Sequence, residues 1–244
     1  MKKAIRFINK CIDTGLLILF LVAFLIGGYA MYDSYLVYEH ANDKSLLKFR
    51  PSAKEEFVET AKELSKDVVA WLTLDDTEVN FPIMQGKTNS EYLNKDPYGK
   101  YSLSGSIFLD SRNAKDFSDP YNLIYGHHMD EGVMFGALDS YLDETFFKEH
   151  TKGTVVTPEK EYDITIFATA DTSAEEDSIF NPTVGGTLEY FKSHHRYYTE
   201  DPPEGAKLIA LSTCKYPDTV DRTVLLGYMT EKGQSEQAPQ ATTP

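Results

Sequence analysis

The strongest hydrophobic pattern in the chain is a continuous uncharged stretch near the N-terminus. Residues 14–32 carry no formal charge, and at about 1.5 Å per residue a helix of this length spans roughly the 30 Å hydrocarbon layer of a bilayer. Basic residues such as Lys2 and Arg6 precede it, and Asp33 follows it. The positive-inside rule therefore predicts a single-pass membrane anchor, with residues 1–13 in the cytoplasm and the chain from residue 33 onward outside the cell.

A cleaved signal peptide is the competing interpretation of the same stretch. Gly28-Tyr29-Ala30 has the small-x-small pattern of a cleavage site. We expect a retained anchor, because the uncharged stretch is long enough to span the membrane. Both interpretations export the remainder of the chain.

After the anchor, the pattern predicts a connector and then a helix. Residues 33–50 form a polar juxtamembrane linker, and a domain is expected over residues 51–232. Ser52 is expected to cap the first helix of this domain, with Glu55 as the reciprocal residue of a capping box. The apolar residues at helical spacing in this segment are Phe57, Ala61, Leu64 and Val68.

From Val69 onward, short apolar runs replace the helical pattern. Clusters of Gly, Pro, Asn and Asp separate most of them, as is typical of an antiparallel sandwich or a closed β-barrel. The runs that we expect to form strands are 79–83, 106–109, 122–125, 154–156, 162–167, 207–211 and 223–226.

Two further segments have helical spacing, and the C-terminus has none. One apolar stripe combines Phe135 with Leu138 and Tyr141, and a second helix is expected over 187–196. The second lies in the long connection before the strand at 207, and connections of this length are usually functional or disordered. Residues 233–244 are rich in Gln, Ala, Thr and Pro, which predicts a disordered tail.

Composition limits the class of protein. The 244 residues are 41% hydrophobic and 13% aromatic, which is enough for one large domain or two small ones with a sizeable core. The net charge of −14 argues against a nucleic-acid partner, since binding to phosphates needs clustered Lys and Arg.

Cysteine usage gives the first indication of chemistry. The chain has two cysteines: Cys11, at the edge of the apolar stretch, and Cys214, which is alone in the exported part. No disulfide can therefore form within the exported domain. An unpaired thiol in an exported protein is a candidate nucleophile, although a buried inert cysteine is the simpler alternative.

Two other residues at predicted strand ends complete a set for acyl transfer. His127 follows the strand at 122–125, and Arg222 precedes the strand at 223–226. A thiolate attacks an acyl carbon, a histidine transfers protons, and a permanently charged guanidinium stabilises the oxyanion. Spacing along the chain does not show that Cys214, His127 and Arg222 meet in space.

At these residues the chain resembles the sortases, the membrane-anchored cysteine transpeptidases of Gram-positive bacteria. Leu211-Ser212-Thr213-Cys214 resembles their Leu-x-Thr-Cys signature, and Tyr125-Gly126-His127 resembles their histidine motif. Arg222 lies at the expected short distance after the cysteine. Class B is most similar, because the helical lead-in, the Gly105–Asp110 segment and the helix in the long connection are features of that class. Ala210 departs from the Thr that many sortases have at this position.

The resemblance implies a mainly β fold, namely a closed eight-stranded barrel with an N-terminal helix and a helix in the loop before the cysteine strand. It also implies that Cys214 cleaves a C-terminal sorting signal after Thr and forms a thioacyl enzyme. His127 is then the general acid and base, and Arg222 binds the oxyanion or the substrate backbone. Ser212 and Thr213 are expected to contact substrate, Ser212 more than Thr213.

The implied partners are secreted proteins with an Asn-Pro-x-Thr or Leu-Pro-x-Thr signal, and an amine acceptor on peptidoglycan or on a pilin lysine. The chemistry needs no cofactor. A metal site built from His127, His128, Asp130 and Glu131 is disfavoured, because no His-Glu-x-x-His pattern is present. His128 is expected to be supporting or exposed, since successive strand residues face opposite ways.

Two other classes of function stay open at this point. The first is another exported cysteine peptidase or acyltransferase, although the Ser-His-Gly-Cys cluster of peptidoglycan L,D-transpeptidases is missing. The second is a non-enzymatic surface module, in which Cys214 would be unreactive. Arg222 could also be no more than a surface partner of Asp221 or Asp218.

Overall fold

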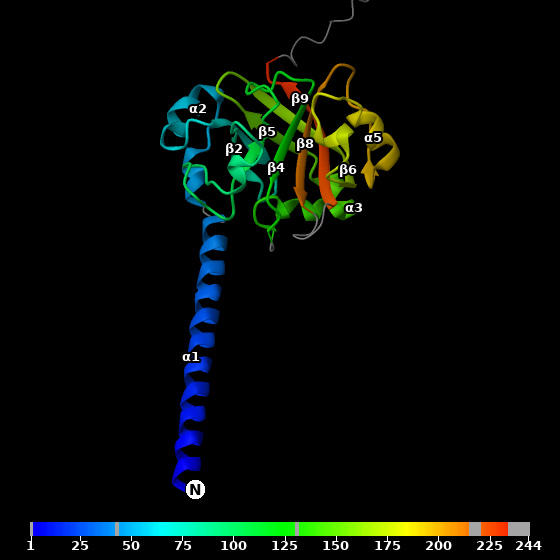
Figure 1. Ribbon diagram of the computed structural model, residues 1–244. Helices are drawn as coiled ribbons and strands as arrows, with labels where there is room; N and C mark the ends of the chain where they lie inside the picture. The colour runs from blue at the N-terminus through cyan, green and yellow to red at the C-terminus, as the bar shows by residue number, and fades with distance from the viewer. Residues whose placement is uncertain (1, 42–43, 130–131, 215–220, 234–244) are drawn as a thin grey trace, which may run out of the picture. The chain divides into compact units, whose positions relative to one another are not determined.

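The computed structural model describes residues 2–41, 44–129, 132–214 and 221–233 (Figure 1). The chain divides into two compact units, residues 1–40 and residues 41–244. The predicted tail therefore lies outside the described residues, apart from Gly233.

The first unit is a single long helix. Helix α1 covers Lys2–Ala41, including the whole of the uncharged stretch, and the apolar side chains of that stretch are exposed. The helix continues through residues 33–41, where neither proline nor glycine interrupts it. It is long and apolar enough to cross a membrane.

The second unit is a β-barrel. Its strands are β1 (Val68–Leu74), β2 (Asn80–Met84), β3 (Ile107–Leu109), β4 (Tyr121–Gly126), β5 (Lys152–Val156), β6 (Glu161–Ser173), β7 (Tyr197–Tyr198), β8 (Lys207–Cys214) and β9 (Asp221–Glu231). They are hydrogen-bonded in the order β5-β1-β2-β3-β4-β8-β9-β6-β7, and β5 also pairs with β6. The β5–β6 pairing closes eight strands into a ring, with the two-residue β7 appended to β6. The expected closed eight-stranded barrel is confirmed.

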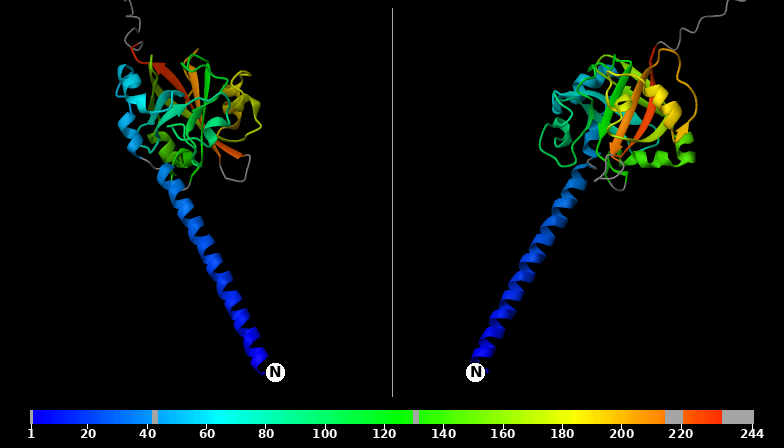
Figure 2. Two further views of the ribbon diagram at one scale, coloured as in Figure 1. Left: turned by 60° about the vertical axis from the view of Figure 1, so that its left-hand side comes forward. Right: turned by 45° about the vertical axis from the view of Figure 1, so that its right-hand side comes forward.

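Most neighbouring strands are antiparallel, and two pairs are parallel. β2 runs parallel to β3, and β4 runs parallel to β8. In Figures 1 and 2, β4, β8 and β9 lie side by side as the green, orange and red strands of the barrel wall. The carboxyl ends of β4 and β8 therefore lie at the same edge of the barrel as the start of β9.

The helical elements are short and lie in the connections. They are η1 (Lys44–Phe49), α2 (Lys54–Thr60), η2 (Ala61–Glu63), η3 (Glu91–Leu93), η5 (Phe135–Leu142), α3 (Glu144–Glu149), α4 (Asp177–Phe180) and α5 (Thr187–His194), of which the η elements are 3-10 helices. Both expected helical inserts are present, as η5 and α5, whereas α3 and α4 were not predicted.

The expected cap of the first domain helix is wrong. Helix α2 begins after Ala53, which makes no side-chain cap, and the Ser52 backbone N–H donates to Glu56 Oε2 at 3.0 Å rather than to Glu55. The helical pattern also stops earlier than predicted. Val68 opens β1 and pairs with Met84, because a β-branched residue suits a strand next to buried neighbours.

Two apolar layers hold the strands of the barrel wall rigidly. On β8, Ile209 and Leu211 belong to the cluster inside the barrel. The intervening Ala210 belongs to a second cluster on the outer face, together with Phe191 of α5 and Ile179 of α4. This alternation is the period of a strand buried on both faces. Side chains at the ends of such strands are therefore held in well-defined positions, as a binding or catalytic site requires.

Candidate active site

The strand register brings the three candidate residues to one edge of the barrel. In the parallel β4–β8 pair, Gly126 is opposite Thr213, and the next residues of the two segments are His127 and Cys214. In the antiparallel β8–β9 pair, Cys214 is directly opposite Arg222. Cys214 and Arg222, which follow His127 by 87 and 95 residues in the sequence, thus become its neighbours at the ends of three adjacent strands.

A cleft of about 390 Å³ lies at this edge of the barrel. His127, Ser212, Thr213 and Arg222 line it, and so do apolar and aromatic side chains from the neighbouring segments, including Leu93, Phe108, Tyr125 and Phe180. A mostly apolar cleft with a few convergent polar groups is the usual form of a binding site for a substrate.

His127 has a defined ring orientation. Its Nε2 lies 2.8 Å from the Leu93 carbonyl oxygen. A carbonyl oxygen can only accept a hydrogen bond, so Nε2 carries a proton. In the neutral ring, Nδ1 is then the nitrogen with the free lone pair, which is the arrangement of a histidine that can act as a base.

The neighbouring histidine has a different environment. His128 Nε2 lies 2.7 Å from Asp139 Oδ2, and its side chain is mostly buried. His127 lines the cleft, whereas His128 is not among the residues that line it. This difference supports the choice of His127 as the histidine of the site.

Arg222 is positioned at the rim of the cleft. It lines the cleft, and its Nη1 donates to the Asp221 backbone carbonyl at 3.0 Å. The contact with Asp221 is therefore made to the backbone rather than to the carboxylate. Asp218, the other partner considered from the sequence, lies outside the described residues.

Ser212 and Thr213 have buried hydroxyls at the end of β8. Each residue is 1% exposed, and neither hydroxyl has a hydrogen-bond partner within the part of the chain that the structure describes. Buried hydroxyls are ordinarily paired, so two adjacent unpaired ones at a cleft are a feature that a bound ligand would explain.

A buried carboxylate beside the cleft was missed in the sequence. Asp110 directly follows β3 and is 0% exposed. It accepts hydrogen bonds from Arg112 Nε at 2.8 Å, from Asn89 Nδ2 at 2.8 Å and from the Tyr125 hydroxyl at 3.1 Å. Its place directly after a strand, in the Gly105–Asp110 segment, was the available signal.

The electrostatics of this group follow from its contacts. Burial alone would raise the pKa of Asp110, but the hydrogen bonds from Arg112 and Asn89 outweigh it and hold the pKa below its usual value. Burial raises the pKa of Tyr125, and the charge of Asp110 raises it further. At neutral pH the carboxylate is therefore ionised, and the Tyr125 phenol is a neutral donor.

Metal ligation finds no support among the described residues. Within residues 2–41, 44–129, 132–214 and 221–233, no group of three or more His, Cys, Asp or Glu side chains is arranged to hold an ion. Asp130 and Glu131, which the sequence offered as ligands, lie outside these ranges.

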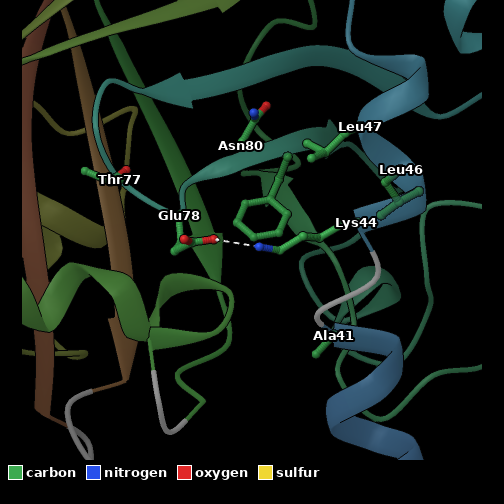
Figure 3. A pocket seen from close by; sticks show the side chains of 8 residues that line it. Ala41, Lys44, Leu46, Leu47, Thr77, Glu78 and Asn80 are labelled. Carbon is green, nitrogen blue, oxygen red and sulfur yellow. Dashed lines mark ion pairs between the residues drawn. The ribbon is translucent and has the colours of Figure 1, made fainter.

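A second hollow in the same unit has no catalytic set. This cavity has a volume of about 110 Å³, and its apolar lining is Ala41, Leu46, Leu47 and Phe81. Figure 3 shows Ala41, Leu46 and Leu47 on one side of it. Its charged residues are Lys44 and Glu78, which pair at 3.8 Å with both side chains well exposed. An exposed pair of this kind contributes little, and the described residues of the lining include neither a cysteine nor a histidine.

Comparison with known proteins gives a consistent result. A family model described as the sortase domain matches residues 72–230. Sortase B of Staphylococcus aureus is 29% identical over 231 residues, which cover 86% of this chain and 93% of that protein. Sortase B of Listeria monocytogenes is 35% identical over 159 residues, which cover 63% of this chain and 65% of that protein.

Solved structures give the same match at the level of the fold. A class B sortase of Streptococcus pyogenes involved in pilus biogenesis superposes with a TM-score of 0.66 at 37% identity, covering 70% of this chain and 97% of that one. The Staphylococcus aureus sortase B–substrate complex superposes with a TM-score of 0.67 at 26% identity, covering 78% of this chain and 94% of that one.

Proposed function

The chain belongs to the sortase family of cysteine transpeptidases, with relatives of class B, and on that premise we propose that it cleaves a sorting signal through Cys214 and transfers the acyl group to an amine. The observation that carries the proposal is the strand register, which makes Cys214 the neighbour of both His127 and Arg222 at one edge of the barrel.

The proposed reaction has two acyl transfers. His127 takes the proton of the Cys214 thiol, and the resulting thiolate attacks the carbonyl carbon of Thr in the signal, so that the negative charge moves to the carbonyl oxygen. When the intermediate collapses, the C–N bond breaks and the leaving amine takes a proton from His127. A thioester on Cys214 results. The acceptor amine then attacks this thioester, gives its proton to His127 and expels the thiolate.

The roles of the other residues follow from their position. The guanidinium of Arg222 stabilises the oxyanion, or holds the substrate backbone, with donors that keep their charge at every relevant pH. The hydroxyls of Ser212 and Thr213, which find no partner among the described residues, are proposed to bond to the substrate. Of the two, we assign the larger contribution to Ser212, which lies two residues before the nucleophile on the same strand.

Substrate and acceptor are proposed by analogy with the relatives. The substrate is a secreted protein with an Asn-Pro-x-Thr signal, as class B resemblance suggests, with a Leu-Pro-x-Thr signal as the second candidate. The acceptor is a peptidoglycan amine or a pilin lysine. The Streptococcus pyogenes relative, which is involved in pilus biogenesis, supports the second acceptor.

The proposed location is the outer face of the cell membrane, with α1 as the anchor. The full-length protein should stay in the membrane pellet after carbonate washing, because α1 is long and apolar enough to span the bilayer. Immunoblotting of pellet and supernatant measures this. A mature N-terminus near Met31 in the recovered protein would show a cleaved signal instead.

The transfer step distinguishes this enzyme from a simple peptidase. The full chain in detergent is incubated with Asn-Pro-x-Thr and Leu-Pro-x-Thr peptides in which position x is a mixture of amino acids. Each reaction is run with and without an acceptor peptide that carries a free amine. Mass spectrometry should show a new amide between the signal fragment and the amine. Hydrolysis alone, even with abundant amine, would favour an exported cysteine peptidase over a transpeptidase.

Removing the proposed oxyanion donor should have a large effect on the rate. Arg222→Ala should lower kcat/KM by about 10²–10³-fold, which is the cost of losing one oxyanion donor. Arg222→Lys is the matched control: it keeps the charge but loses the fork of donors, so it should recover part of the loss. Peptide cleavage kinetics measure both, and equal activity of Arg222→Ala and the wild type would exclude the role.

A further inference from the structure

The buried carboxylate of Asp110 is tied to one wall of the cleft through Arg112. Arg112 donates to it three times, from its backbone N–H at 2.9 Å, from Nε at 2.8 Å and from Nη2 at 2.7 Å. The same Nη2 donates to the Phe180 carbonyl oxygen at 2.6 Å. Phe180 is the last residue of α4, in the long connection between β6 and β8.

The carboxylate also orients residues on the other walls. The Asn89 side chain donates to Asp110 and accepts from the Ser111 backbone N–H at 2.7 Å. The Tyr125 hydroxyl donates to the same Oδ2, and the Tyr125 ring stacks on Phe180 with centroids 6.4 Å apart. All four side chains that Asp110 holds directly or through Arg112 and Tyr125, namely Asn89, Arg112, Tyr125 and Phe180, line the cleft.

Among the described side chains, the hydrogen bonds of Asp110 and Arg112 do not involve His127 or Arg222. His127 is held separately, by the Leu93 carbonyl, and Arg222 donates from Nη1 to the Asp221 carbonyl on β9. Asp110 is therefore connected to side chains that line the cleft and, within the described part of the chain, to neither His127 nor Arg222. A residue placed in this way affects how well substrate is bound more than how fast bound substrate reacts.

We infer that Asp110 is a positioning residue that, through the Arg112 guanidinium and the Phe180 carbonyl, clamps α4 against the barrel and so shapes the cleft for the sorting-signal peptide; the inference rests on the proposed function. The clamp is defined as Asp110, Arg112 and the Phe180 carbonyl. The long connection has a second tie beside it, since the Tyr121 hydroxyl donates to the Ile179 carbonyl at 2.9 Å. Because α4 is already held in place, the sorting-signal peptide can bind in the cleft without the cost of ordering the connection that contains α4.

The test uses the full chain in detergent with Asp110→Asn, which removes the charge and keeps the shape of the side chain. KM for the cleaved peptide should rise at least about tenfold, while kcat stays within about twofold, as expected when uniform binding is lost. Alkylation of Cys214 by iodoacetamide should proceed at the wild-type rate. Arg112→Lys, which keeps the charge and loses the fork, should raise KM in the same way but less.

A matched control lies at the opposite end of β9. Glu231 is a partly buried carboxylate paired with Lys160 at 3.0 Å, and Glu231→Gln is the same chemical change as Asp110→Asn. It should leave KM unchanged. Hydrogen exchange of residues 176–184 should accelerate in Asp110→Asn and Arg112→Lys, and not in Glu231→Gln.

The results separate this inference from the proposed function. An unchanged KM together with unchanged exchange in both clamp variants would overturn the clamp, and so would a fall in kcat matched by slower Cys214 alkylation. If the wild-type chain cleaves neither peptide, the proposed function fails. In that case, the hydrogen-exchange rates of residues 176–184 in the wild type and in the two clamp variants alone decide whether Asp110 holds α4.

Discussion

Replacing Cys214 with alanine should abolish both cleavage of the sorting signal and transfer to the amine. The thiolate is the atom that forms the covalent bond in the proposed mechanism, and neither His127 nor Arg222 can replace it. We expect turnover to fall by at least about 10⁴-fold, to the uncatalysed background. The measurement is product formation from the Asn-Pro-x-Thr and Leu-Pro-x-Thr peptides, followed by mass spectrometry.

The other cysteine provides the control. Cys11 lies in α1 and is exposed, far along the chain from the barrel. Cys11→Ala removes a thiol without touching β8, so its turnover should equal that of the wild type. Undiminished activity of Cys214→Ala would contradict the proposed mechanism and would place the chemistry elsewhere in the chain.

His127→Ala should be the second most damaging change. Loss of a positioned general acid and base costs about 10²–10⁴-fold, because the leaving amine must then depart without a proton and the attacking amine must lose its proton to water. The kcat/KM for peptide cleavage measures the loss. The melting temperature should change little, since His127 bonds to the Leu93 carbonyl from a partly exposed position after β4.

The neighbouring histidine separates a chemical role from a local structural one. His128→Ala removes the contact with Asp139 but leaves the cleft lining intact. We expect its kcat/KM to stay within about threefold of the wild type, as for a group that takes no part in proton transfer. If His128→Ala were the inactive variant and His127→Ala the active one, the assignment of the two rings would be reversed.

Much of the barrel could be predicted from the sequence because each strand carries its own signal. The runs at 122–125, 207–211 and 223–226 became β4, β8 and β9, whose ends bear the candidate residues. The predictions placed these residues at strand ends. They could not place them together, because the parallel pairing of β4 with β8 is decided by contacts between segments far apart in the chain.

The failures have physical causes of the same kind. The prediction of a capping box between Ser52 and Glu55 was wrong, because the Ser52 N–H donates to Glu56, the residue after Glu55. The clamp was missed because its parts are 68 residues apart, from Arg112 to Phe180. A sequence pattern shows an aspartate after a strand, but the tertiary fold determines that this aspartate is buried and paired.

The central claim is that Cys214 forms a thioester with the sorting signal, and a trapped adduct tests it most directly. The full chain in detergent is mixed with the sorting-signal peptide that it cleaves, quenched in acid and digested. The mass of the proteolytic fragment that contains Cys214 is then measured by mass spectrometry. Its mass should increase by that of the signal fragment ending in Thr, less one water, and hydroxylamine should remove the increase. An adduct on another residue, or the same adduct in Cys214→Ala, would contradict the account.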